Sequence, residues 1–119
     1  MPQSTMAQPD KLPAMEILSL YAAAWSDTQK MLSAARNEDW DNLIGLEQNR
    51  RSHVDKVLQM DKGNMENREF LARKSELIRS IISADEEIKL LTRAWMEQLK
   101  ETLGVIGMDK RLQQAYGHL

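Results

Sequence analysis

A long amphipathic pattern between Phe70 and Leu103 constrains the fold of this chain more than any other feature. Apolar residues recur there at alternating spacings of three and four, which places them on one face of an α-helix. This first stripe consists of Leu77, Ile81, Ala84, Ile88, Leu91, Trp95 and Leu99. The pattern therefore predicts one long helix with a continuous apolar face.

A second apolar stripe runs beside the first one on the same predicted helix. It consists of Leu71, Ile78, Ile82 and Met96. Together the stripes cover about half of the helix circumference, whereas the apolar face of a surface helix is usually only somewhat wider than 100°. The surplus indicates a surface for a partner. For Ile78 and Ile82 we weigh equally the alternative that the two stripes contact two neighbouring helices of a bundle.

The composition favours an all-α protein with a single domain. The chain has 119 residues with only 5 Gly and 3 Pro, and 5% of its residues are aromatic. This length supports one domain with a modest core. Residues 1–12 are polar, contain two prolines and lack periodicity, so we expect a loose N-terminal tail there. Residues 13–119 are expected to form the helical domain.

Two further helices are predicted before the long one. The first spans residues 13–36 and begins at Pro13, a residue that is favoured at helix starts. The second spans residues 39–60, and a turn at residues 61–64 leads into the third helix, with Asn64 as its expected N-cap.

The second helix carries an interrupted apolar stripe. Its members are Trp40, Leu43, Ile44, Val54 and Leu58. Glu47 and Arg51 fall in the middle of this stripe, and their spacing of four residues places them within reach of each other. We therefore expect these two side chains to pair at the edge of a half-buried face.

The C-terminal segment, residues 108–119, is predicted to be a short amphipathic helix that acts as a lid. Met108, Leu112 and Tyr116 recur at helical spacing, but a helix of this length is unstable alone in water. We expect it to dock reversibly on the surplus face of the long helix, because Gly104 and Gly107 form a hinge between them. The expected fold is thus an antiparallel three-helix bundle with a short, mobile fourth C-terminal helix.

The charge and the residue types exclude several classes of function. A net charge of -2 provides no basic field for nucleic acid or for an anionic membrane. No apolar run is long enough for a membrane span, no signal peptide is evident and Cys is absent, so we expect a cytoplasmic protein. The acidic run Asp85, Glu86 and Glu87 fits a solvated charge run better than a metal site. No catalytic, cofactor-binding or metal-binding residues are predicted.

His53 supports a second hypothesis. His53 and Lys56 reproduce the His-x-x-Lys spacing of histidine phosphotransfer domains, which are also small helical bundles. We expect His53 to be exposed enough to accept a phosphoryl group. Those domains usually have glycine directly after the lysine, whereas this chain has Val57. A surface histidine with no chemical task therefore remains the favoured interpretation.

Three segments resemble FliT-type flagellar export chaperones. They are residues 36–43 (RNEDWDNL), 85–88 (DEEI) and 112–119 (LQQAYGHL), and the resemblance covers most of the chain after about residue 14. It implies a helical chaperone that keeps the filament-cap subunit soluble and unassembled in the cytoplasm and delivers it to the flagellar export ATPase complex. In some family members the free chaperone also restrains the flagellar master transcription activator, and the last helix masks part of the binding face.

Residue patterns and resemblance together predict a contact face on the long helix for an amphipathic segment of the cap subunit. The expected contact residues are Leu71, Ile78, Ile82, Leu91, Trp95 and Leu99, with Met108, Leu112 and Tyr116 as the regulatory lid. A third hypothesis is a structural adaptor that forms a symmetric homodimer through the whole stripe of the long helix. The sequence leaves the oligomeric state open.

Overall fold

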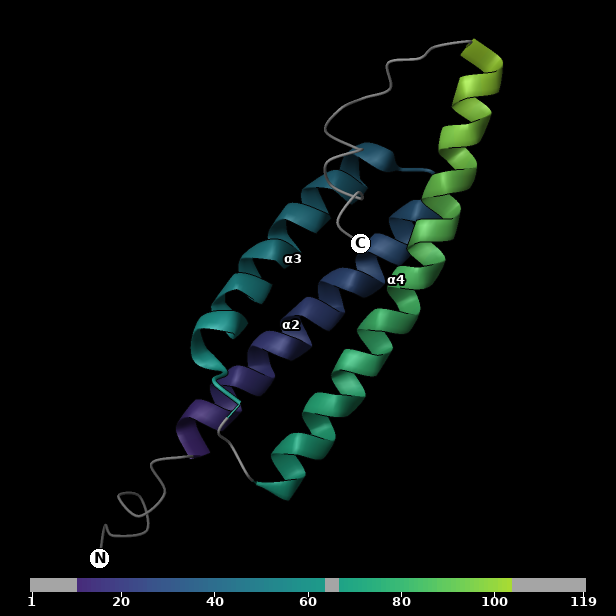
Figure 1. The fold of residues 1–119 in the computed structure, drawn as a ribbon. Helices are drawn as coiled ribbons and strands as arrows, with labels where there is room; N and C mark the ends of the chain where they lie inside the picture. Colours follow the sequence, from purple (N-terminus) through teal and green to yellow (C-terminus); the bar gives the residue numbers. More distant parts are fainter. Residues whose placement is uncertain (1–10, 64–66, 104–119) are drawn as a thin grey trace, which may run out of the picture.

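The computed structural model describes residues 11–63 and 67–103, and in these ranges the chain forms three α-helices without any strand. Helix α2 spans Lys11–Arg36, α3 spans Trp40–Met60 and α4 spans Arg68–Leu103 (Figure 1). The prediction of an all-α fold with three main helices is therefore confirmed. The predicted tail, apart from its last two residues, and the predicted fourth helix lie outside the described residues.

The three helices run up, down and up, with α2 between α3 and α4 (Figure 1). Close backbone packing joins α2 to α3 and α2 to α4. Helices α3 and α4 are instead connected to each other by long side chains. Arg50 pairs with Asp85, and Trp40 stacks on Trp95. Helix α2 is thus the floor on which the other two helices lie.

The turn between α2 and α3 ends the first helix at the predicted place. The amide of Asp39 donates to the carbonyl of Ala34 at 2.8 Å, and the amide of Glu38 donates to that of Ala35 at 3.1 Å. This pair of hydrogen bonds is a Schellman motif, in which the residue after the helix adopts the left-handed conformation. Glu38 fills that position with a φ of 57° although it is not glycine.

Two helix starts differ from the sequence-based expectation. Helix α2 begins at Lys11, two residues before Pro13, because a proline within the first helical turn removes no intrahelical hydrogen bond. Helix α4 begins at Arg68, and the side chain of Asn67 accepts a hydrogen bond from the amide of Phe70 at 3.0 Å. The N-cap is therefore Asn67, whereas the predicted cap Asn64 lies outside the described residues.

The apolar core lies where α2 meets the first half of α3 and the middle of α4. Its buried members are Met31, Ala34, Ala35, Leu43 and Ile88, with Leu32, Trp40, Leu46 and Leu91 packed around them. Leu77 and Ala84 of the predicted first stripe are buried as well. The first stripe of the long helix therefore supplies the main contact of α4 with the rest of the bundle.

The predicted stripe of α3 was wrong in its second half. Val54 is 38% exposed and Leu58 is 69% exposed, whereas Arg50 and Val57 are buried. The buried face of α3 follows a helical phase in which a polar position, Arg50, faces the other helices. Arg50 is stable there because it has polar partners, and this phase leaves Val54 and Leu58 exposed on the side of α3 that faces α4.

A buried polar layer crosses the three helices at Arg50. One guanidinium nitrogen, Nη1, donates to Asp85 Oδ1 of α4 at 2.6 Å and to Thr28 Oγ1 of α2 at 3.0 Å. Thr28 in turn donates to the carbonyl of Ala24 at 2.7 Å. A buried arginine is tolerated only when its charge and its donors are satisfied. The layer therefore fixes α3 and α4 at one height relative to α2.

Asp61 ties the far end of the bundle together. Its carboxylate accepts a hydrogen bond from Tyr21 Oη at 2.9 Å and pairs with Lys74 Nζ at 2.5 Å, and it also accepts from the Gly63 amide. Burial opposes ionisation of Asp61, but these hydrogen bonds outweigh it and lower the pKa of its carboxyl group. Burial and the bond to Asp61 raise the pKa of Tyr21 to about 12. Asp61, directly after α3, thus connects α3 to α2 through Tyr21 and to α4 through Lys74.

Replacement of Asp61 by Asn should destabilise the fold by about 1–2 kcal/mol at pH 7, because the charged partner of Lys74 is lost. The folded pKa of Asp61 is lowered, so its contribution is complete above the ordinary carboxyl pKa near 4 and disappears as the pH falls through the lowered value. Urea unfolding from pH 7 to pH 2 should therefore show a smaller loss of stability in acid for Asp61→Asn than for the unchanged protein.

The matched control for this experiment is Asp55→Asn, which removes the same charge from an exposed position of α3. It should leave both the stability at pH 7 and its acid dependence unchanged. Equal behaviour of the two variants would contradict the role assigned to Asp61.

Candidate protein-binding surface

An apolar groove lies between the second half of α3 and the first half of α4, with α2 as its floor. We call it the α3/α4 groove, and its volume is about 280 Å³. Its lining residues are Tyr21, Ala24, Arg50, Val54, Val57, Leu58, Ile78, Ile81, Ile82 and Asp85. Apart from Tyr21 and the ion pair of Arg50 with Asp85, every side chain of the lining is aliphatic.

Large apolar side chains are left in water along the rims of this groove. Leu58 on α3 is 69% exposed, and Ile82 on α4 is 54% exposed. They belong to opposite walls of one hollow, so they form a continuous apolar surface rather than scattered exposed residues. A helix laid along the groove would remove both side chains from water.

The structure divides the six predicted contact residues between separate places. Ile78 and Ile82 line the α3/α4 groove, and Leu71, 45% exposed, lies two helical turns before Ile78 on α4. Leu91 packs against the core. Trp95 and Leu99 line a different hollow, near the C-terminal end of α4. The lid residues Met108, Leu112 and Tyr116 lie outside the described residues.

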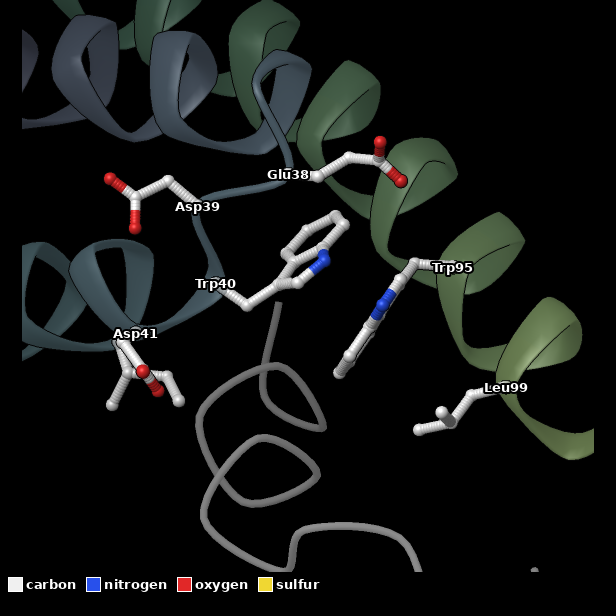
Figure 2. A pocket seen from close by; sticks show the side chains of 7 residues that line it. Glu38, Asp39, Trp40, Asp41, Trp95 and Leu99 are labelled. Atoms are coloured by element: carbon white, nitrogen blue, oxygen red, sulfur yellow. The ribbon is translucent and has the colours of Figure 1, made fainter. Parts of the chain in front are cut away.

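This second hollow is built around a pair of tryptophans, and we call it the tryptophan hollow. It has a volume of about 420 Å³ and is lined by Glu38, Asp39, Trp40, Asp41, Ile44, Trp95 and Leu99. The rings of Trp40 and Trp95 stack with their centroids 4.7 Å apart and their planes 29° apart. Figure 2 shows the two rings facing each other, with Leu99 beyond Trp95.

Sequence reasoning missed half of each hollow. The walls that α3 contributes are Val54 and Leu58 in one hollow and Trp40 in the other, residues that the sequence places on the apolar stripe of α3 and not on the contact face. The sequence contains one sign that the α3 stripe is not a continuous buried face, because Glu47 and Arg51 interrupt it. The two pair as predicted, with Arg51 Nη2 2.6 Å from Glu47 Oε1.

The side chain of His53 on α3 contacts α2. Its Nδ1 lies 2.7 Å from Oδ2 of the buried Asp27, and its side chain is 26% exposed. Asn49 donates to the other oxygen of the same carboxylate at 3.0 Å. Lys56 is exposed. The imidazole therefore packs against α2, and the Asp27 carboxylate would repel a phosphoryl group at Nδ1.

The acidic run of α4 serves to connect helices. Asp85 pairs with Arg50, and Glu87 accepts from Arg36 Nε at 2.8 Å and from Nη2 at 3.0 Å. The hydrogen bond from Arg36 lowers the pKa of Glu87. Within residues 11–63 and 67–103, no group of three or more acidic or histidine side chains is placed to hold a metal ion. None of the described helices combines the length and the apolar character that crossing a membrane requires.

Comparison with known proteins identifies flagellar relatives. The sequence model of the family described as "Flagellar protein FliT" matches residues 18–118. A protein named "Flagellar protein FliT" from Photorhabdus laumondii subsp. laumondii is 23% identical over 103 residues, which cover 87% of this chain and 82% of that protein. No solved structure matches this chain.

Proposed function

The chain belongs to the FliT family of flagellar proteins, and from this premise we propose that it is a flagellar export chaperone that works by binding, without catalysis. The cargo in this proposal is the filament-cap subunit. The chaperone holds it soluble in the cytoplasm, prevents its premature assembly and delivers it to the export ATPase complex. The α3/α4 groove is the observation that supports the proposal most directly.

The groove suits an amphipathic helix of the cap subunit. Its two walls, on α3 and α4, lie antiparallel (Figure 1), and Leu58 on one wall and Ile82 on the other are both exposed. An apolar helix face inserted between such walls is a common mode of peptide recognition. Burial of one Leu or Ile side chain contributes about 1.5–3 kcal/mol, part of which is lost in ordering the bound segment. Such binding is tight enough to protect cargo and remains reversible.

The proposed contact face still comprises all six residues predicted from the sequence. Ile78 and Ile82 hold the centre of the groove, and Leu71 extends it toward the start of α4. Trp95 and Leu99 continue the face beyond the polar layer. Leu91 contributes through its support of the core between the two hollows.

Replacement of both Leu58 and Ile82 by Asp should weaken the complex with the cap subunit by about 3–4 kcal/mol. Each change removes apolar contact and adds a charge that must lose its water on binding. Both side chains are more than half exposed in the free protein, so the helical content and the thermal midpoint should change little. Titration calorimetry and circular dichroism measure the two quantities.

Leu90→Asp is the matched control for the groove variants. Leu90 is 64% exposed on α4, as apolar as Ile82, but it does not line the groove. It should bind the cap subunit with unchanged affinity. Equal weakening by Leu90→Asp and by the groove variants, or an unchanged affinity of the groove variants, would move the binding site elsewhere.

Regulation by the C-terminal segment completes the proposal. Residues 108–119, with Met108, Leu112 and Tyr116 as contacts, act as a lid that competes with partners for the contact face. The free chaperone then also restrains the flagellar master transcription activator when the lid is displaced. A homodimer formed through the same face would compete with the lid and with cargo alike.

Truncation after Leu103 should raise the affinity for at least one export or regulatory partner while the three described helices stay intact. A lid that is closed for part of the time reduces the apparent affinity of every competitor by the fraction of open molecules. Tyr116→Asp should act in the same direction. Titration of the cap subunit and of export ATPase components with intact and truncated chains, accompanied by sedimentation to detect a dimer, measures the effect. Equal affinities throughout would rule out a lid, and loss of binding would make the segment part of the site.

A further inference from the structure

The tryptophan hollow lies beyond the C-terminal end of α2. In this region α4 no longer packs against α2. Arg36, the last residue of α2, pairs with Glu87, and α4 extends to Leu103, about 24 Å further along its axis. Among the described helices, only the start of α3 approaches α4 there, through the stack of Trp40 on Trp95 (Figure 1). Within residues 11–63 and 67–103, the hollow is therefore an apolar site at the end of the bundle that α2 does not cover.

Three acidic residues line part of this apolar site, and no described residue forms an ion pair with them. Glu38, Asp39 and Asp41 are all exposed, and none forms an ion pair with any residue in the described ranges. In Figure 2 the carboxylates of Glu38 and Asp41 lie on opposite sides of Trp40, while the Asp39 side chain points away from Trp95. The nearby cation of Arg36 is already held by two hydrogen bonds to Glu87.

A stacked pair of indoles with a negative rim selects a particular occupant. Lys and Arg side chains have apolar stems that cover aromatic rings and cationic ends that reach outward to carboxylates. An acidic segment would be repelled by the rim, and an uncharged apolar one would leave the carboxylates without partners. The charge of the rim therefore favours a basic peptide segment over other occupants.

We infer that the tryptophan hollow is a docking site for a basic peptide segment of a partner protein, one that alternates Lys or Arg with aliphatic residues. The inference deepens the proposed function and rests on it for Trp95 and Leu99, which belong to the proposed contact face. The chemistry differs from that of the α3/α4 groove, because this second site depends on charge as well as on apolar contact.

The probe is an acetylated and amidated Arg-Leu-Lys-Leu-Arg peptide, titrated into the full-length protein and followed by the indole N–H signals in nitrogen–proton correlation spectra. The signals of Trp40 and Trp95 should shift, while that of Trp25, which does not line the hollow, should stay. A peptide with Gln in place of every Lys and Arg should bind at least threefold more weakly. Higher salt should weaken the basic peptide selectively.

Neutralisation of the rim by Glu38→Gln and Asp41→Asn together should weaken the basic peptide by roughly three- to tenfold. The matched control is Asp55→Asn with Glu86→Gln, which removes the same number of charges from exposed positions outside both hollows. The control should bind like the unchanged protein, and thermal unfolding of both variants checks that α3 remains folded.

Several outcomes would overturn the inference. They are absence of indole shifts, equal binding of the Gln peptide, equal weakening by the control, and shifts confined to residues of the α3/α4 groove. A concentration-dependent dimer that loses its contacts when Trp95 is replaced by Leu would assign the hollow to a second copy of the chain. The rim variants are also compared with the Leu58→Asp, Ile82→Asp double variant for binding of the cap subunit. If only the double variant loses this binding, failure of the tryptophan hollow and failure of the proposed function are distinguished.

Discussion

The arrangement of the helices depends on the buried guanidinium of Arg50. Helices α3 and α4 each pack closely on α2, and the ion pair of Arg50 with Asp85 connects them to each other across it. An arginine in this position loses its water, so it is stable only with Asp85 and Thr28 in place. This requirement sets the separation of α3 and α4, and a groove remains beside the pair in which Leu58 and Ile82 stay more than half exposed.

The polar layer also divides the surface between α3 and α4 into two sites of different chemistry. On one side lies the aliphatic α3/α4 groove, and on the other lies the tryptophan hollow with its acidic rim. Ile82 and Trp95 are separated by about 20 Å along the axis of α4. In our proposal, a partner segment of moderate length spans both sites and gains apolar contact in one and charge complementarity in the other.

The sequence predicted the elements well, because each helix carries its own periodicity and its own end signals. The close of α2 at Arg36, the pairing of Glu47 with Arg51 and the burial of Leu77, Ala84 and Ile88 all follow from local spacing. The contact of Arg50 with Asp85 could not be predicted, since it joins residues 35 positions apart whose relation depends on how α3 and α4 lie on α2. For the same reason the exposure of Val54 and Leu58, the stack of Trp40 on Trp95 and the contact of His53 with Asp27 became visible only in the fold.

The central claim, that the pair of Arg50 with Asp85 sets the separation of α3 and α4, is tested most directly by a distance measurement between the two helices. The chain has no natural cysteine, so spin labels can be attached at Asp55→Cys and Ser83→Cys, both exposed positions beside the groove. Double electron–electron resonance should give one narrow distance distribution in the otherwise unchanged protein. When Arg50→Met and Asp85→Leu replace the ion pair by apolar side chains, the fold should remain but the distribution should broaden or shift. An unchanged distribution in that folded double variant would contradict the account.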